Sequence, residues 1–79
     1  MQVIKLRKDD DYIKLGQALK AAALVSSGIE AKEVILSELV KVNGEVETRR
    51  GRKLYDGDIA SFDSQLIKIE KLNGERSVN

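Results

Sequence analysis

The chain has 79 residues, with 14 Lys and Arg against 13 Asp and Glu, and it contains no Cys, His, Pro or Trp. This length allows one domain with a small core. Without Cys and His, disulfides and zinc sites of the usual kind are excluded, and most acid–base and nucleophilic catalysis near neutral pH loses its usual side chains. We therefore expect no enzyme and no cofactor. The longest apolar run, residues 21–25, is far too short to cross a membrane, so we expect a cytoplasmic protein with no membrane partner.

Positive charge is concentrated in one part of the chain. Residues 39–53 contain five basic and two acidic side chains, a balance of +3, and four of the five residues from 49 to 53 are cationic. Such a cluster repels itself and weakens a fold unless an anion usually lies nearby. Two interpretations are open, namely a solvated surface loop and a phosphate-binding patch.

The N-terminal segment, residues 1–6, is short and contains the β-branched Val3 and Ile4, which predict an edge strand or an extended arm. Asp9, Asp10 and Asp11 follow it. Adjacent carboxylates point apart instead of converging on a cation, so these residues favour a solvated turn before a helix over a metal site.

Helical periodicity begins after this turn. In residues 12–25 the apolar side chains recur at helical spacing, which predicts an amphipathic helix with a face of small residues: Leu15, Ala18, Leu19 and Ala22. After a break at residues 26–28, Ser27 and Glu30 have the spacing of a capping box. They predict a second helix from about residue 29 to residue 38, with three side chains facing inward: Ala31, Val34 and Ile35.

The pattern then alternates around Asn-Gly at residues 43–44, which predicts a β-hairpin. A two-residue loop would mix apolar and charged side chains on both faces. A three-residue loop over residues 43–45 would pair Val42 with Val46 on one face and Lys41 with Glu47 on the other. We favour the three-residue loop, which leaves residues 49–53 as an exposed connection.

The C-terminal part contains a turn at residues 56–58 and two short strand candidates at residues 59–62 and 66–72, joined through Asp63-Ser64. Residues 73–79 are polar and are expected to form a flexible tail. We therefore expect a single domain over residues 1–72.

Several of these features resemble one known family in combination. The two helices with a Ser-Gly turn, Lys32, Val-Lys-Val-Asn-Gly at residues 40–44 and Asp-Gly-Asp-Ile at residues 56–59 resemble the S-four RNA-binding domain, or alpha-L RNA-binding motif, named after ribosomal small-subunit protein four. The resemblance covers residues 12–62. Residues 47–53, Glu-Thr-Arg-Arg-Gly-Arg-Lys, are similar to the small stand-alone members of the YaaA and YbcJ type. The implied fold is α+β, with two packed helices against a small, mostly antiparallel sheet.

The resemblance also implies an RNA surface at the start of the second helix and at the hairpin after it. Carried over residue by residue, the implied contacts are Ser27, Lys32, Lys41, Asn43 and Gly44, and the match to the small proteins adds Arg49, Arg50, Arg52 and Lys53. The family commonly has Gly just before the hairpin strand, where this chain has Glu38.

Only three aromatic residues are present, Tyr12, Tyr55 and Phe62, and two of them lie in or beside apolar patterns. We therefore expect no base-stacking platform and contacts made by Arg and Lys to the phosphates of structured RNA. The expected partner is structured RNA, with ribosomal RNA or the ribosome as candidates, bound by a monomer that has no small-molecule substrate. Two alternatives stay open: a protein-interaction module whose basic loop docks an acidic partner, and an enzyme that uses Lys or Asp.

Overall fold

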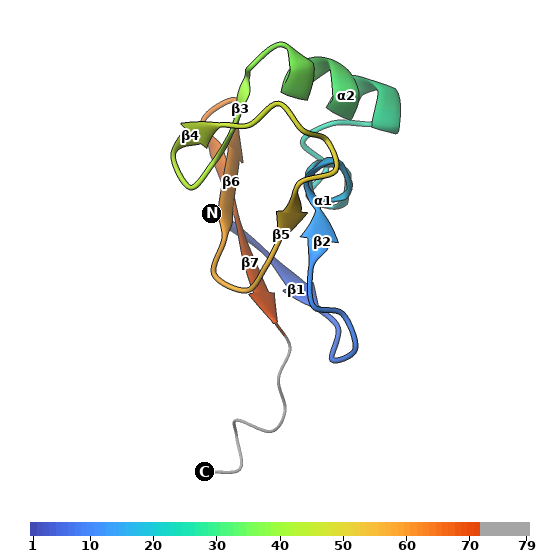
Figure 1. Cartoon of the computed structure of the whole chain (residues 1–79), viewed down its shortest axis with the longest axis vertical. Helices are drawn as coiled ribbons and strands as arrows, with labels where there is room; N and C mark the ends of the chain where they lie inside the picture. The colour runs from blue at the N-terminus through green and yellow to red at the C-terminus, as the bar shows by residue number, and fades with distance from the viewer. Residues whose placement is uncertain (72–79) are drawn as a thin grey trace.

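The computed structural model describes residues 1–71, which form a five-stranded sheet, a two-stranded ribbon and two helices (Figure 1). The larger sheet has the order β1-β7-β6-β3-β4, built from β1 (Gln2–Leu6), β7 (Gln65–Lys71), β6 (Ile59–Phe62), β3 (Val40–Val42) and β4 (Glu45–Val46). β1 pairs with β7 in parallel, and the other pairs are antiparallel. The predicted α+β fold and the N-terminal edge strand are therefore confirmed. The expected tail at residues 73–79 lies outside the described residues.

The first helix begins later than its periodicity predicted. Ile13 and Lys14 form β2 (Ile13–Lys14), which pairs antiparallel with β5 (Lys53–Leu54) in a separate ribbon. The helix α1 is Leu15–Ala21. The periodicity could not show this boundary because β2 is defined by its pairing with a strand some 40 residues further along the chain.

The second helix, α2, is Gly28–Leu36, close to the predicted range. The Ser27 hydroxyl accepts a hydrogen bond from the Glu30 backbone amide at 3.1 Å, as the capping pattern predicted. The other half of the box differs. The Glu30 carboxylate accepts from the backbone amide and the hydroxyl of Ser26, both at 2.8 Å, and these bonds, the backbone one first, lower the pKa of Glu30.

Glu38 closes α2 in the conformation that a glycine usually adopts there. Its φ is 65°, and the backbone amides of Glu38 and Leu39 donate to the carbonyls of Ile35 and Val34, both at 3.1 Å. These two bonds form a Schellman motif, which satisfies carbonyls at the helix end. The backbone is thus the one a glycine would favour, although the residue is a glutamate.

The predicted three-residue hairpin loop is wrong. The register pairs Val42 with Glu45, so the loop has two residues, Asn43 and Gly44, with φ of 53° and 86°. Positive φ at both positions is typical of a type I′ turn, whose twist matches that of the flanking strands. The predicted register assumed that Val46 faces the core and that Glu47 faces solvent. In the structure Val46 is 48% exposed, while Glu47 is buried among polar partners.

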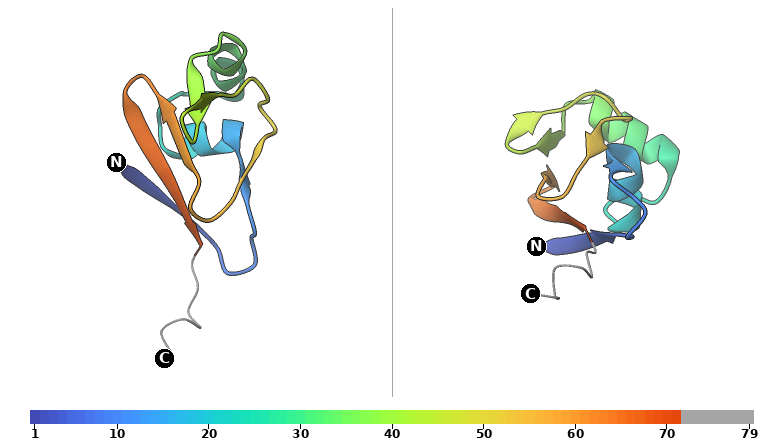
Figure 2. Two further views of the ribbon diagram at one scale, coloured as in Figure 1. Left: turned by 60° about the vertical axis from the view of Figure 1, so that its left-hand side comes forward. Right: turned by 60° about the horizontal axis from the view of Figure 1, so that its bottom comes forward.

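The core lies between the larger sheet and the two helices, which stand across from β6 and β7 in Figure 2. Ala18 and Ala31 are fully buried, and their small side chains let α1 and α2 pack closely. The largest fully buried side chains come from every layer: Leu15, Leu19, Ile35, Val40, Leu54, Ile67 and Ile69. Neither helix in residues 1–71 is long and apolar enough to span a bilayer.

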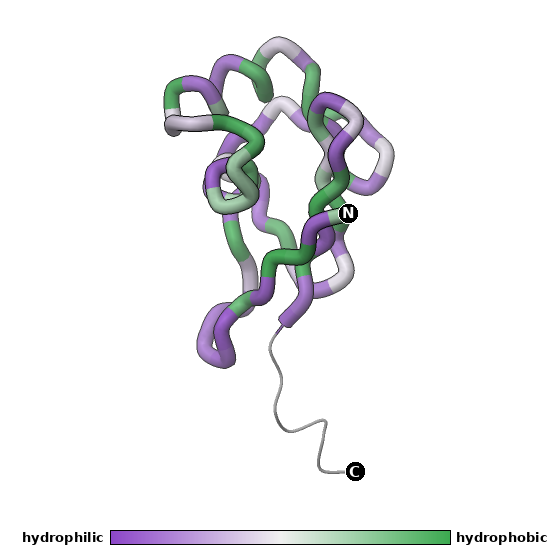
Figure 3. The backbone as a smooth tube through the Cα atoms, turned by 180° about the vertical axis from the view of Figure 1, so that it is seen from behind, coloured by the Kyte–Doolittle hydropathy of each residue, from purple (hydrophilic) through white to green (hydrophobic). Residues whose placement is uncertain are grey.

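The three aspartates lie in a hydrophilic turn between β1 and β2 (Figure 3). The Asp10 amide donates to the Arg7 carbonyl at 2.9 Å, and the Lys71 ammonium contacts the Asp10 carbonyl and the Asp11 carboxylate. No group of side chains suited to holding a metal ion occurs within residues 1–71.

Candidate nucleic-acid interface

The basic loop, residues 47–53, leaves β4 and passes across the start of α1 before it enters β5 (Figure 1). Its backbone is bonded to that helix. The amide of Leu15 donates to the Arg52 carbonyl at 2.8 Å, and the amide of Gly16 donates to the Arg50 carbonyl at 3.1 Å. The loop therefore supplies partners for amides that a helix start leaves unsatisfied.

Gly16 leaves room for the Arg50 side chain where the loop meets α1. A β-carbon at this position would lie 2.7 Å from Cγ of Arg50, closer than real contacts allow. The aliphatic part of Arg50 packs against the bare helix backbone, while the residue as a whole stays exposed. A side chain at position 16 would thus displace the side chain of Arg50.

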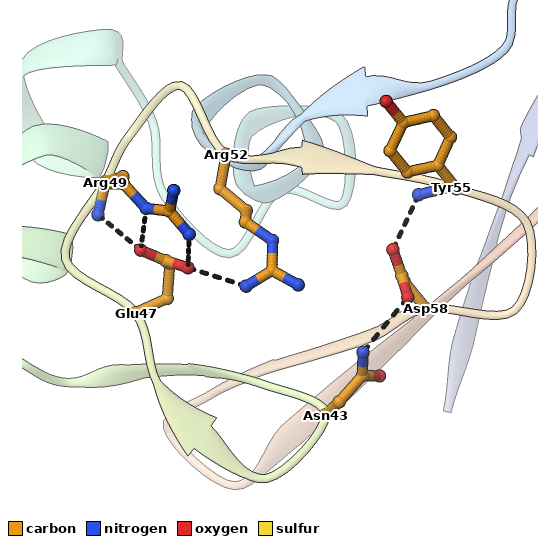
Figure 4. A network of polar contacts seen from close by, with 6 residues as sticks. All are labelled: Asn43, Glu47, Arg49, Arg52, Tyr55 and Asp58. Atoms are coloured by element: carbon orange, nitrogen blue, oxygen red, sulfur yellow. Dashed lines mark hydrogen bonds and ion pairs between the residues drawn. The ribbon is translucent and has the colours of Figure 1, made fainter.

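Glu47 organises two of the arginines (Figure 4). Its carboxylate accepts hydrogen bonds from Nε and Nη2 of Arg49 at 2.9 and 3.0 Å, from the Arg49 backbone amide at 2.9 Å, and from Nη1 of Arg52 at 2.7 Å. These bonds, with the Arg49 side chain first among them, lower the pKa of Glu47 to about 2, and they raise the pKa of Arg49. The carboxylate stays charged and fixes both guanidinium groups in place.

The other cations of the loop are differently placed. Within residues 1–71, neither Arg50 nor Lys53 takes part in an ion pair. Both are exposed. They are therefore available to an anion without first releasing a carboxylate.

A surface hollow of about 330 Å³ brings the loop and both helix starts together. It is lined by Lys14, Gly16, Gln17, Lys20, Gly28, Ala31, Arg50 and Gly51. Two of the predicted site residues flank it: Ser27 precedes Gly28, and Lys32 lies one helical turn further on the same side of α2. Sequence analysis missed Lys14 and Lys20. In the sequence, both lysines are recognisable only as polar positions of the predicted first helix. Such positions occur on binding faces and on solvent-exposed faces alike.

The predicted hairpin residues lie apart from this hollow. Lys41 alternates with the buried Val40 and Val42, so its side chain points to the opposite face of the sheet. The Asn43 side chain is engaged within the protein, because it donates to the Asp58 carboxylate at 3.0 Å and accepts from the Ile59 amide at 2.9 Å. Gly44 provides the positive φ of the turn.

Two of the three aromatic rings lie partly at the surface of the protein. Tyr12 and Tyr55 are 37% and 47% exposed, and their ring centroids lie 5.8 Å apart. The ammonium of Lys53 lies 4.8 Å from the centroid of the Tyr12 ring, a cation–π contact. Leu54 is buried and Ile13 packs against the core, whereas Tyr12 and Tyr55, which directly adjoin β2 and β5, are exposed.

The protein is a small α+β domain with a basic loop, and comparison with known proteins gives its family. The model of the S4 domain matches residues 4–70, so the chain belongs to the S4 domain family, as the sequence motifs indicated.

Two relatives are similar over most of their own length. The chain is 46% identical over 55 residues to "Probable ribosome maturation protein RlbA" of Bacillus subtilis (strain 168), which covers 70% of this chain and 78% of that protein. It is 34% identical over 58 residues to "Putative RNA-binding protein YbcJ" of Escherichia coli (strain K12), which covers 73% of this chain and 83% of that protein.

Proposed function

We propose that this protein is a non-catalytic RNA-binding protein that recognises structured RNA, with ribosomal RNA as its class of partner. One observation carries the proposal: cations from β2, α1 and the basic loop line a single hollow beside the start of α2. The S4 domain family and the names of the two relatives support it.

The surface suits phosphates held at fixed spacing. Arg50, Lys14 and Lys20 reach the hollow from three elements, and Lys32 extends the same surface along α2. Arg52 uses only Nη1 for Glu47, so its remaining N–H groups stay available for a phosphate oxygen. A set of donors held by secondary structure favours a partner whose phosphates are themselves fixed, as in folded RNA.

The proposal gives the predicted site residues different roles. We assign phosphate contacts to Lys32, Arg49, Arg50, Arg52 and Lys53, with Ser27 at the edge of the hollow. Lys41 would contact RNA only if the partner extends around the hairpin to the far face of the sheet. Asn43 and Gly44 would act mainly by shaping the turn.

The test should remove cations without breaking the Glu47 network. Replacing Arg49 and Arg52 would leave the Glu47 carboxylate without its partners, so loss of binding could reflect misfolding. We choose instead a site variant with three changes: Lys14→Gln, Arg50→Gln and Lys53→Gln. A matched control removes the same charge elsewhere: Lys5→Gln, Lys8→Gln and Lys68→Gln.

The assay is a titration of a folded ribosomal RNA fragment at several salt concentrations. The site variant should bind at least tenfold more weakly, and its log–log salt slope should fall by roughly 2–3, because each lost phosphate contact removes about 0.7–0.9. The control should change the affinity much less. Equal losses in the two variants would refute the site and leave only general attraction between charges.

Competition distinguishes the remaining possibilities. At one fixed salt concentration, the folded fragment should compete better than its unstructured permutation and better than a DNA duplex, which lacks the 2′-hydroxyls and the A-form shape. Equal competition by all three would indicate a general polyanion surface. Binding to a polyglutamate peptide but to none of the nucleic acids would favour the alternative, a module for acidic protein partners.

A further inference from the structure

The outer face of the β2–β5 ribbon carries a pair of tyrosines and a pair of lysines, as the register of the two strands shows. Ile13 lies opposite Leu54 and Lys14 opposite Lys53. Extending this register by one residue places Tyr12 opposite Tyr55, in agreement with their ring distance of 5.8 Å. Because side chains alternate along a strand, the two tyrosines and the two lysines share one face.

The two facing lysines are unfavourable for the isolated protein. Like charges directly opposite each other across antiparallel strands destabilise the pair, and Lys14 and Lys53 are so placed. Two large aromatic rings also remain partly exposed beside them, in a chain with only three aromatic residues. An anion with an attached flat apolar group would satisfy both features together, and a nucleotide has this chemistry.

Tyr55 is the ring that lies beside the basic loop. It borders a surface hollow of about 520 Å³ that is otherwise lined by cationic residues and a glycine: Arg49, Gly51, Arg52 and Lys53. Tyr12 is turned by 53° against Tyr55, and the Lys53 ammonium lies over the Tyr12 ring. Tyr12 lines a different hollow with residues of β1 and α1, so Tyr55 is the ring next to the cations of the basic loop.

The backbone that carries Tyr55 is fixed by neighbouring polar groups. Its amide donates to the Asp58 carboxylate at 2.7 Å, and the same carboxylate accepts from the Asn43 side chain (Figure 4). The ring is therefore presented from a braced position, which reduces the ordering that binding would require.

We propose that Tyr55 stacks against one unpaired nucleobase of the bound RNA, while Lys53 and Arg52 contact the phosphate of that nucleotide. The inference rests on the proposed RNA-binding function and adds a preference to it. The protein would select folded RNA that displays an unpaired nucleotide next to a helix over an uninterrupted duplex. Stacking is tolerant of base identity, so the preference is for an exposed base and not for a sequence.

The experiment compares two RNA hairpins that differ in one base. The first has a single bulged nucleotide, and the second has an abasic residue in its place, so the phosphates are the same in both. The full-length protein should bind the bulged hairpin about tenfold more tightly, as expected for one base stacked on an aromatic ring. Tyr55→Leu should bind the two hairpins equally, whereas Tyr55→Phe should retain the difference.

A spectroscopic signal accompanies the titration. The chain has two tyrosines and no tryptophan, so its intrinsic emission comes from the Tyr12–Tyr55 pair alone. The bulged hairpin should quench this emission more than the abasic one does. Far-ultraviolet circular dichroism of each variant controls for folding.

The outcomes separate the two proposals. Equal binding of both hairpins by the unmodified protein, or a base-dependent difference that survives in Tyr55→Leu, would overturn the stacking inference and leave the cationic site in place. If neither hairpin bound, the proposed function would be overturned as well. A difference lost in Tyr55→Leu and kept in Tyr55→Phe supports both.

Discussion

Glu47→Gln should destabilise the protein at neutral pH while nearly preserving the shape of the side chain. The carboxylate accepts four hydrogen bonds from Arg49 and Arg52. The amide of glutamine is neutral, and one of its two terminal groups is a donor that cannot serve an arginine. The variant therefore loses charge-assisted bonds and leaves two guanidinium groups without a counterion.

The size of the effect follows from the pKa of Glu47, which falls from 4.5 to about 2 in the folded protein. At 1.36 kcal/mol per unit, this shift corresponds to about 3 kcal/mol of folding free energy. The Glu47 side chain is only 8% exposed, but its partner Arg49 is 71% exposed. Water then screens the pair, and we expect about 1–2 kcal/mol.

The pH dependence of the folding stability tests whether the ionised Glu47 carboxylate is stabilising. A depressed carboxyl pKa contributes stability that is complete above pH 4.5 and is lost as the pH falls toward about 2. Thermal unfolding of both proteins, followed by circular dichroism, should show a midpoint difference of roughly 5–10 °C at pH 7. The difference should shrink between pH 4.5 and 2. A difference that is absent at pH 7, or that persists unchanged at pH 2, would refute this reasoning.

Glu38→Gly should raise the free energy of unfolding by about 0.5–1 kcal/mol, because φ of 65° strains a residue with a β-carbon; a lower melting midpoint would contradict this. Gly44→Val should lower the free energy of unfolding by about 1–3 kcal/mol, because φ at this position is 86°. Gly51 lies outside the left-handed region and has open space around it, so Gly51→Ala should be nearly neutral when both variants are compared by chemical denaturation. Gly16→Ala should shift Arg50 and weaken RNA binding several-fold in a titration. Its free energy of unfolding should change little, because the steric cost of the β-carbon and the higher helix propensity of alanine nearly cancel. Unchanged binding would show that the position of Arg50 is unimportant.

Local signals in the sequence were sufficient for most of the fold. Ser27 and Glu30 located the start of α2, and Asp63-Ser64 located the turn between β6 and β7. The start of α1 was misplaced because β2 exists only through pairing with β5. The hairpin register was misjudged because Glu47 is buried by its bonds to arginines, and a polarity pattern assigns such a residue to solvent.

The candidate site was predictable only in part. The run of cations at residues 49–53 was visible, since it needs no tertiary information. Which of them are engaged was not, because the partner of Arg49 and Arg52 depends on how the loop folds back. The outward position of Tyr55 likewise depends on the β2–β5 pairing, which turns Leu54 into the core.

The carbonyls of Arg50 and Arg52 that accept from the start of α1 hold the loop backbone before any ligand arrives. Ordering a flexible loop costs about 1–2 kcal/mol of conformational entropy per residue. Association with a polyanion would therefore lack the entropic penalty and the large heat-capacity change of coupled folding, and calorimetry would report mainly the contacts themselves. It also follows that the side chains of Arg50 and Lys53, which take part in no ion pair within residues 1–71, can be exchanged while the loop backbone stays in place.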